Sequence, residues 1–337
     1  MVLPAGTGAL SKISQKIFNV LTLQRIQGII KEARKEFGMK TLYGITVAMI
    51  TPFTDEDTVD IPSLEKYTEY LIEAGVNCLY PCGSTGEMSN LTEDERKLVV
   101  ETVVKSAAGR IPVFAQVGTS TTAGTIRLAQ HAVDCGADGI GVVTPWYMSL
   151  SDKELEEYYV TIAKSVPDDF SVYLYGIPQC AANDITPSLA TRIAERCKNV
   201  VGIKYSSPDI IRMQKFMKIN NRTFSVLTGV EDLYPITMAA GGQGIVSGAA
   251  SAIPEYFVAL KAALGSADRD RAAYLNEQIC NLYTALSVNN VVATYKAALK
   301  IKGVIATKNM RAPLAPLSDI EESILENVLN SNKYKEA

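Results

Sequence analysis

A lysine ends a short apolar run, at the place where a buried strand would end. The run "VVGIK" closes with Lys204, and two serines and a proline follow within the next four residues. A lysine at a strand end usually lays its stem along apolar surface and keeps its ammonium in water. A lysine held in a pocket can instead attack a carbonyl as the neutral amine and form a Schiff base. The groups that surround it decide between the two.

Hydroxyl groups stand at the ends of three other apolar runs. "GSTGE" (83–87) sets Ser84 and Thr85 between glycines, which let a ligand approach the backbone amides as in a cradle for a carboxylate or phosphate. A tight turn with ordinary capping is the alternative. "TPWYMS" and "YLYGIPQ" bring in Tyr147 and Tyr175. A phenol beside a Schiff-base lysine can carry protons, although phenols at strand ends often serve only for packing.

These side chains need elements that bring them to one place, and the chain offers eight apolar runs about 25 residues apart. The runs are 44–50, 78–82, 112–118, 139–143, 171–175, 200–204, 224–228 and 244–248. They are continuously apolar, which is typical of parallel strands buried on both faces. Amphipathic helix patterns separate them, and one of these begins with the capping box "TEDE" (92–95).

Eight such units predict an α/β fold that closes into a (β/α)8 TIM barrel. A doubly wound sheet is the rival, but "TPFTDED" replaces the glycine-rich dinucleotide turn after the first strand. Active sites of these barrels lie at the ends of the strands, and this position favours a functional role for Lys204.

Both ends of the chain differ from the barrel. Residues 1–38 have apolar residues at helical spacing, and we interpret them as an N-terminal helical extension that packs on the body or on a neighbouring subunit. A targeting segment or an added sequence are the alternatives. The catalytic barrel is predicted over residues 39–265. A C-terminal helical region is predicted over residues 266–337, where strand patterns stop.

Composition excludes several classes of function. A net charge of −3 gives no reason to expect a nucleic-acid partner, and no run of 18 apolar residues predicts a membrane span. The six cysteines form no C-x-x-C pair, which is typical of reduced thiols in a cytoplasmic enzyme. The only histidine, His131, falls in mid-helix. We therefore expect neither a zinc site nor a Ser-His-Asp triad.

Taken together, the motifs resemble the pyruvate-dependent class I aldolases that include dihydrodipicolinate synthase and N-acetylneuraminate lyase. The resemblance runs in order over residues 39–330, through "GITVAMITPF", "GSTGE", "VTPWY", "YLYGIP", "VVGIK" and "YKAALK". It implies a Schiff base between Lys204 and pyruvate or another 2-oxo acid, with no metal or cofactor. It also implies a homotetramer made of two tight dimers.

The resemblance further implies individual roles. Tyr175 and Ser84 match the proton relay, and Tyr147 matches the tyrosine that a neighbouring subunit lends to it. Thr85 matches the residue that binds the pyruvate carboxylate, and the backbone carbonyl of Val246 lines the same pocket. An iminium is an electron sink, so C–C cleavage through it requires no metal.

Two departures bear on the substrate. Dihydrodipicolinate synthases usually carry S-R-T-G after their Y-N-V-P turn, and its arginine clamps the carboxylate of aspartate semialdehyde. Here "YGIPQCAAND" has no arginine between Gly176 and Thr191. Ser206 adds a hydroxyl where the sialic-acid lyases place threonine, and Glu231, Asp232 and Ser247 could bind a sugar chain. For Asp232, a helix N-terminal acid is an equal alternative.

We therefore expect a lyase that acts on a 2-oxo-3-deoxy sugar acid or a related hydroxy-oxo acid. It would cleave this acid into pyruvate and an aldehyde, or form it by condensing the two. The alternative is a dihydrodipicolinate synthase with a different carboxylate anchor. A homologue that binds a 2-oxo acid without catalysis is a third hypothesis, against which the complete proton relay argues.

Overall fold

A computed structural model of the chain describes residues 39–286 and 290–330. The helical extension predicted over residues 1–38 lies outside the described residues. From Thr41 onward the described residues form one compact unit. Eight parallel strands form its centre: β1 (Gly44–Ala48), β2 (Cys78–Tyr80), β3 (Phe114–Gln116), β4 (Gly139–Val143), β5 (Ser171–Gly176), β6 (Val200–Tyr205), β7 (Ser225–Thr228) and β8 (Gly244–Ser247).

The strands confirm the predicted (β/α)8 barrel. Their order is β2-β1-β8-β7-β6-β5-β4-β3, and every neighbouring pair is parallel. A parallel bridge between Leu79 and Val113 joins the two outer strands and closes the ring. Because the strands are parallel and closed, all their carboxyl ends meet at one face.

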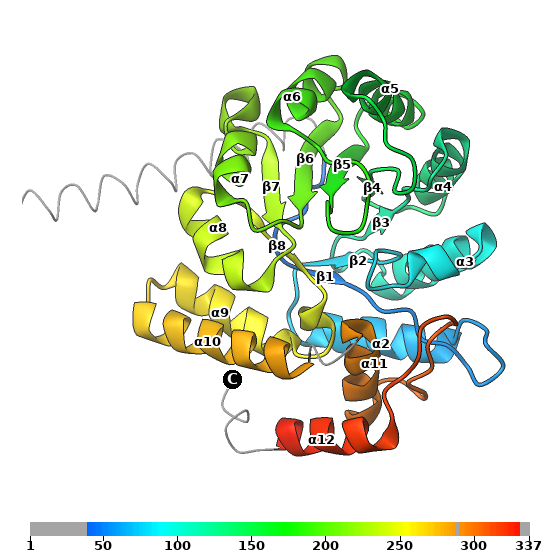
Figure 1. Cartoon of the computed structure of the whole chain (residues 1–337), viewed down its shortest axis with the longest axis vertical. Coiled ribbons are helices and arrows are strands. Elements are labelled where there is room, and N and C mark those ends of the chain that lie inside the picture. Colours follow the sequence, from blue (N-terminus) through cyan, green and yellow to red (C-terminus); the bar gives the residue numbers. More distant parts are fainter. Residues whose placement is uncertain (1–38, 287–289, 331–337) are drawn as a thin grey trace, which may run out of the picture. The chain divides into compact units, whose positions relative to one another are not determined.

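Helices surround the strands (Figure 1). They are α2 (Ile61–Glu73), α3 (Glu93–Ala107), α4 (Thr122–Asp134), α5 (Asp152–Ala163), α6 (Pro187–Arg196), α7 (Ile210–Phe216), α8 (Tyr234–Ala240) and α9 (Pro254–Gly265). The predicted capping box is present at Thr92 and Glu95, and Ser151 and Glu154 form a second one at α5. These caps satisfy amide donors that the first helical turn leaves free.

Side chains of the strands divide between two apolar clusters. Ile45, Val47 and Ile203 belong to the large cluster that includes the inner faces of the helices. Tyr80, Tyr173 and Val246 belong to a smaller cluster inside the ring. Burial on both faces explains why the strands read as continuous apolar runs instead of alternating ones.

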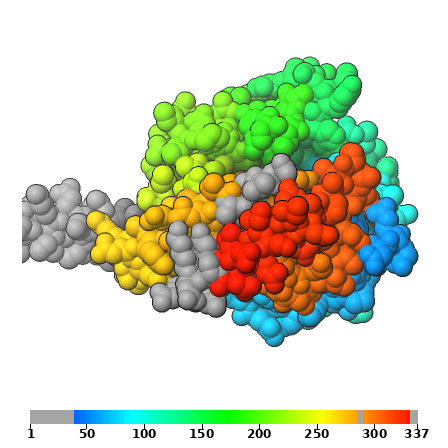
Figure 2. Space-filling model, turned by 60° about the horizontal axis from the view of Figure 1, so that its bottom comes forward, coloured from blue at the N-terminus to red at the C-terminus, as the bar shows by residue number. Residues whose placement is uncertain are grey.

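Three further helices follow the barrel, as the sequence predicts: α10 (Arg269–Leu286), α11 (Val291–Ile301) and α12 (Asp319–Asn330). α10 lies beside α9, and the segment after α11 reaches the loop after β1. There the Asn309 side chain donates to the Thr54 carbonyl at 3.1 Å. Figure 2 shows this orange and red C-terminal segment against the blue one. The predicted boundaries at residues 39 and 265 themselves stay predictions.

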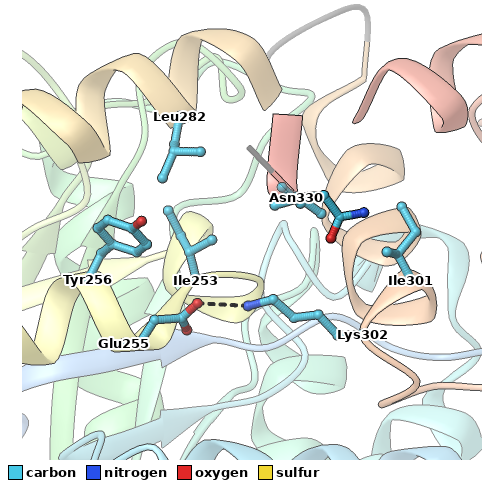
Figure 3. Close-up of a pocket in the computed structure, with 8 residues that line it drawn as sticks. Ile253, Glu255, Tyr256, Leu282, Ile301, Lys302 and Asn330 are labelled. Atoms are coloured by element: carbon cyan, nitrogen blue, oxygen red, sulfur yellow. Dashed lines mark hydrogen bonds and ion pairs between the residues drawn. The ribbon is translucent and has the colours of Figure 1, made fainter. Parts of the chain in front are cut away.

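The C-terminal helices also enclose a pocket of about 280 Å³ (Figure 3). Apolar side chains from α9 to α12 line it together with an ion pair of 2.8 Å between Lys302 and Glu255. None of the predicted site residues lines this pocket. In the described part of the chain, no helix is both long and apolar enough to cross a bilayer.

The contact between β1 and β8 leaves no room for a side chain at Gly244. A Cβ there would lie 2.2 Å from the Gly44 carbonyl oxygen and 2.5 Å from the Gly44 nitrogen. Because backbone cannot move aside as a side chain can, we expect Gly244→Ala to lower the free energy of unfolding by about 1–3 kcal/mol or more. Urea denaturation measures this loss.

Gly265 supplies the matched control, because a Cβ on it would meet no atom within 4 Å. It is the last residue of α9, so Gly265→Ala should change the free energy of unfolding by less than about 1 kcal/mol. Equal stability of the two variants would show that β1 and β8 do not approach as closely as described.

Candidate active site

Lys204 lies inside the mouth of the barrel, near the carboxyl end of β6. Its side chain is buried, at 4% relative exposure, and it is the register partner of Tyr175 on β5. The ammonium nitrogen is 4.0 Å from the centroid of the Tyr175 ring and 5.0 Å from that of Tyr80. Among the described residues, no carboxylate forms an ion pair with it. Aromatic rings are therefore its immediate surroundings, and their faces attract the charged form.

Tyr175 connects the lysine to the loop after β2. Its hydroxyl lies 3.3 Å from the Ser84 hydroxyl, and its ring meets the Tyr80 ring edge-on, with centroids 6.3 Å apart. Tyr175 is buried, whereas Ser84 is exposed. The two hydroxyls thus form a path along which a proton can pass between the surroundings of Lys204 and solvent.

The loop 83–87 is held tightly by backbone hydrogen bonds. The Gly86 amide donates to the Gly83 carbonyl at 3.0 Å, and the Glu87 amide donates to the Ser84 carbonyl at 3.1 Å. The Thr51 hydroxyl donates to the Gly86 carbonyl at 2.8 Å. These bonds fix the backbone from which the Ser84 and Thr85 side chains extend.

Thr85 faces the end of β8. A Cβ on Gly248 would lie 3.1 Å from the Thr85 hydroxyl oxygen, so the two residues are in close contact. Val246 lies two residues earlier and is buried, with its side chain in the interior cluster. Thr85 is expected to bind the pyruvate carboxylate, and the Val246 carbonyl is expected to line the same pocket. The two residues come from neighbouring positions at the barrel mouth.

Ser206 shares a close contact with Lys204. A Cβ on Gly229 would lie 2.0 Å from the Ser206 hydroxyl oxygen and 3.3 Å from Cε of Lys204. A glycine is required at this position because any side chain would displace both. The Ser206 hydroxyl consequently lies beside the lysine stem, as the sequence predicts.

Tyr147 does not join these residues within one chain. Its side chain is 83% exposed, and the neighbouring Met148 is 66% exposed. Trp146, by contrast, packs against the small cluster of Val143, Tyr175 and Ile177. This position agrees with the expectation that Tyr147 serves a neighbouring subunit, but no described contact tests that role.

The acidic residues after β7 go to different places. Glu231 is buried, and its carboxylate accepts from the Ser247 hydroxyl at 2.8 Å. Burial raises the pKa of Glu231, and the Lys204 ammonium opposes the rise. Asp232 instead accepts from the Cys280 thiol of α10 at 3.0 Å. Glu231 and Ser247 thus belong to the site, whereas Asp232 supports the packing of α10.

Tyr80 is the site residue that the sequence analysis missed. It ends β2 with its ring beside Lys204, and its hydroxyl fills the space over Gly141, where a Cβ would lie 1.9 Å away. Side chains along a strand point alternately to its two faces, so this alternation could have shown that Tyr80 points into the barrel. The run "CLY" is too short to show which of its side chains point inward. Among the described residues, no cluster of His, Cys, Asp or Glu has the geometry to hold a metal ion.

Among the described residues, the loop that follows β5 on the expected aldehyde side of the site carries no arginine. Cys180 occupies the place where the synthase motif has its arginine. Burial raises the pKa of the Cys180 thiol, and the Lys204 ammonium opposes this rise. The next arginines along the chain are paired: Arg192 with Glu156 at 2.7 Å, Arg196 with Glu157 at 2.6 Å, and Arg212 with Asp184.

Comparison with known proteins assigns the chain to one family. A profile of the dihydrodipicolinate synthetase family matches residues 41–332. The chain belongs to this family. The resemblance drawn from the motifs is thereby confirmed.

Similar proteins of this family are known from several organisms. The 4-hydroxy-tetrahydrodipicolinate synthase of Thermotoga maritima is 32% identical over 292 residues, which cover 86% of this chain and 98% of the relative. That of Aquifex aeolicus is 34% identical over 286 residues, covering 85% and 96%.

Solved structures agree with the sequence comparison. YagE of E. coli K12, a prophage protein of the dihydrodipicolinic acid synthase family crystallised with pyruvate, superposes with a TM-score of 0.81 at 29% identity, over 86% of this chain and 98% of YagE. Dihydrodipicolinate synthase of Aquifex aeolicus also gives 0.81, at 33% identity, over 86% and 97%.

The family places this chain among the class I aldolases and lyases that depend on pyruvate. The expected enzyme class is thus confirmed. The names of the curated relatives match the alternative, a dihydrodipicolinate synthase, better than they match our first expectation of an N-acetylneuraminate lyase-like enzyme.

Proposed function

We propose that the protein joins pyruvate to an aldehyde, or releases pyruvate from the joined product, through an imine on Lys204. The observation that carries this proposal is the placement of the buried Lys204 nitrogen 4.0 Å from the Tyr175 ring, whose hydroxyl meets Ser84. A binding protein needs no such relay beside its lysine.

The reaction would proceed in four steps. The neutral Lys204 amine adds to C2 of pyruvate, and loss of water gives the iminium. A proton then leaves C3, and the iminium takes up the electron pair as an enamine. C3 attacks the aldehyde carbon, and the new alkoxide takes a proton. Water finally adds to the iminium and releases the product, which returns Lys204. No metal or cofactor enters this sequence.

Each remaining residue has a task in these steps. Tyr175 and Ser84, with Tyr147 of a neighbouring subunit, would move protons at the carbinolamine and the enamine. Thr85 would donate to the carboxylate of pyruvate, and the Val246 carbonyl would line the same pocket. These roles rest on the family resemblance and on the proximity of Thr85 to Gly248.

The first candidate for the net reaction is the synthesis of 4-hydroxy-tetrahydrodipicolinate from pyruvate and aspartate semialdehyde. The names of curated relatives with 30–34% identity support it. This identity extends over nearly the whole length of these relatives.

A second candidate is the cleavage of a 2-oxo-3-deoxy sugar acid or a related hydroxy-oxo acid. The observation that favours it is specific to the aldehyde side, where Cys180 replaces the arginine and the neighbouring arginines are paired elsewhere. A charge-assisted contact of that kind contributes about 1.5–3 kcal/mol. The Ser206 hydroxyl beside Lys204 would also suit a hydroxylated substrate.

One set of assays separates the candidates. We would measure kcat/KM for condensation with aspartate semialdehyde, and for pyruvate release from a panel of 2-oxo-3-deoxy acids that includes N-acetylneuraminate. A preference of tenfold or more for aspartate semialdehyde would establish the first candidate. A preference for any hydroxylated acid would establish the second. The variant Cys180→Arg is the internal control, since it should raise kcat/KM for aspartate semialdehyde about tenfold or more by restoring the clamp.

Assembly gives a separate prediction. Because Tyr147 is exposed in one chain yet expected in the relay, we propose a dimer at least, and a tetramer of two tight dimers as the working form. Tyr147→Phe should then lower turnover although its own subunit does not use it. Sedimentation velocity at assay concentration, run on the active enzyme, checks the assembly. A fully active monomer would contradict it.

A further inference from the structure

The last residue of the loop 83–87 is a buried acid that the proposed chemistry does not use. Glu87 has a left-handed backbone, with φ of 56°, and its side chain is almost completely buried. Its carboxylate pairs with the Lys296 ammonium and also accepts from the Arg311 amide at 3.1 Å. A buried carboxylate is costly unless such partners are present. The C-terminal part of the chain therefore supplies the counter-charge of the loop that carries Ser84 and Thr85.

Lys296 is the most deeply buried charged side chain in this region, at 0% relative exposure. It lies on α11, and its nitrogen also donates to the Asn309 carbonyl at 2.8 Å. The same nitrogen lies 4.1 Å from the centroid of the Phe53 ring. Burial lowers the pKa of Lys296 to about 8, and Glu87 opposes this shift. Two bonded partners, Glu87 and Asn309, and the Phe53 ring thus hold the ammonium in one place.

Arg311 extends this cluster. Its guanidinium lies 4.5 Å from the centroid of the same Phe53 ring and pairs with Glu95 at 2.7 Å and with Asp57 at 3.2 Å. Glu95 lies in the first turn of α3, the first α-helix after the loop. The charged groups that face Lys296 are therefore Glu87, Asp57 and Arg311, the last of which is itself neutralised by acids.

α11 supports the loop at a second point as well. Tyr295, the residue before Lys296, packs against Gly248: a Cβ there would lie 3.1 Å from the Tyr295 ring and 3.1 Å from the Thr85 hydroxyl. Tyr295 and Thr85 thus flank the same glycine. One helix consequently contacts Thr85 through Gly248 and Glu87 through an ion pair.

From these contacts we propose that Lys296 is a positioning residue for pyruvate: its ammonium holds the Glu87 carboxylate and thereby fixes Ser84 and Thr85 where the substrate carboxylate and the proton relay require them. The role rests on the proposed function, since it assumes that this loop binds pyruvate. Lys296 itself forms no bond with substrate.

A suitable test separates this role from simple stability. Removal of one partner of a buried pair leaves an uncompensated charge, so Lys296→Met alone could unfold the protein. Replacement of both partners by neutral groups of similar size is often tolerated. The double variant Lys296→Met/Glu87→Gln should therefore fold, yet lack the attraction that positions the loop.

Two measurements follow on this double variant. Amide hydrogen exchange in residues 83–90 of the ligand-free protein should become about tenfold faster, because a loop without its anchor opens more often. The KM for pyruvate should rise about tenfold, whereas kcat at saturating pyruvate should fall by less than this, because every reacting group remains and saturating substrate favours the positioned loop. A general loss of stability would instead accelerate exchange throughout the barrel.

Lys300→Met is the matched control. Lys300 lies one helical turn later on α11 and pairs with Glu322 at 2.9 Å, but its side chain is partly exposed. The same chemical change there should leave both the exchange of residues 83–90 and the KM for pyruvate unaltered. If the double variant does not fold, Glu87→Asp alone carries the test. It keeps both charges and tolerates the left-handed backbone, but withdraws the carboxylate by one methylene, so we expect a smaller rise in KM of about threefold.

The outcomes separate the inference from the proposed function. A double variant with unchanged exchange and a KM within twofold of wild type would overturn the positioning role. Faster exchange in the loop, together with a wild-type protein that forms no adduct with pyruvate, would support the anchor and overturn the proposed function. Faster exchange with a raised KM supports both.

Discussion

Reduction with borohydride in the presence of pyruvate should leave a stable secondary amine on Lys204. The lysine is buried among aromatic rings at the carboxyl end of β6, and no described carboxylate pairs with its nitrogen, which leaves this atom open to bond with a carbonyl carbon. Lys204→Ala should form no adduct and lose at least about 10³-fold in kcat. Intact mass and peptide mapping identify the modified residue.

Lys296 is the internal control in this experiment. It too is a buried lysine, but its nitrogen is engaged by Glu87 and Asn309 and has no access to substrate. We therefore expect its peptide to remain unmodified. An adduct on any lysine other than Lys204, or no adduct with a panel of 2-oxo acids, would refute the imine mechanism.

Tyr175→Phe should leave the fold intact and reduce turnover by about 10²–10⁴-fold, the usual contribution of general acid–base catalysis. The phenol is buried, and its hydroxyl lies 3.3 Å from the Ser84 hydroxyl. Its removal therefore interrupts the proton path while the ring still packs against Lys204. The adduct with pyruvate should form more slowly in this variant, yet on the same lysine.

The neighbouring Tyr173 offers a matched substitution on the same strand. It is buried in the barrel interior, and its hydroxyl accepts from the Leu42 amide at 3.1 Å, away from the relay. Tyr173→Phe should lower stability by about 1 kcal/mol without a large change in turnover. Equal effects of the two substitutions on kcat would assign Tyr175 to packing.

The sequence predicted every strand, and the errors at the strand ends have physical causes. The second apolar run continues to residue 82, but β2 ends at Tyr80 because Pro81 has no amide to donate and Cys82 adopts a left-handed backbone, with φ of 59°. The third run begins at Pro112, whereas β3 begins at Phe114. Apolar composition shows which residues are buried. The backbone amide donors that hydrogen bonding between strands requires decide where each strand ends.

The candidate site was predictable where it depends on the ends of strands. Lys204, Tyr175 and Ser84 meet because parallel strands in a closed ring carry their carboxyl ends to one face. The pairing of Glu87 with Lys296 was not predictable, although both lie in motifs that the resemblance singled out. No local pattern relates an acid in a turn to a lysine on a helix formed so much later in the chain.

That separation has a consequence for how the enzyme is made. Glu87 accepts its hydrogen bond from a residue 224 positions further along the chain, and all eight strands precede both of its partners. Because synthesis runs from the N-terminus, a nascent chain can complete the barrel while this acid still lacks its cation. If the proposed roles hold, competence to bind pyruvate is therefore acquired late, after the ribosome has released Arg311. A chain truncated before α11 would keep Lys204 and the loop 83–87 but would lack the partners of Glu87.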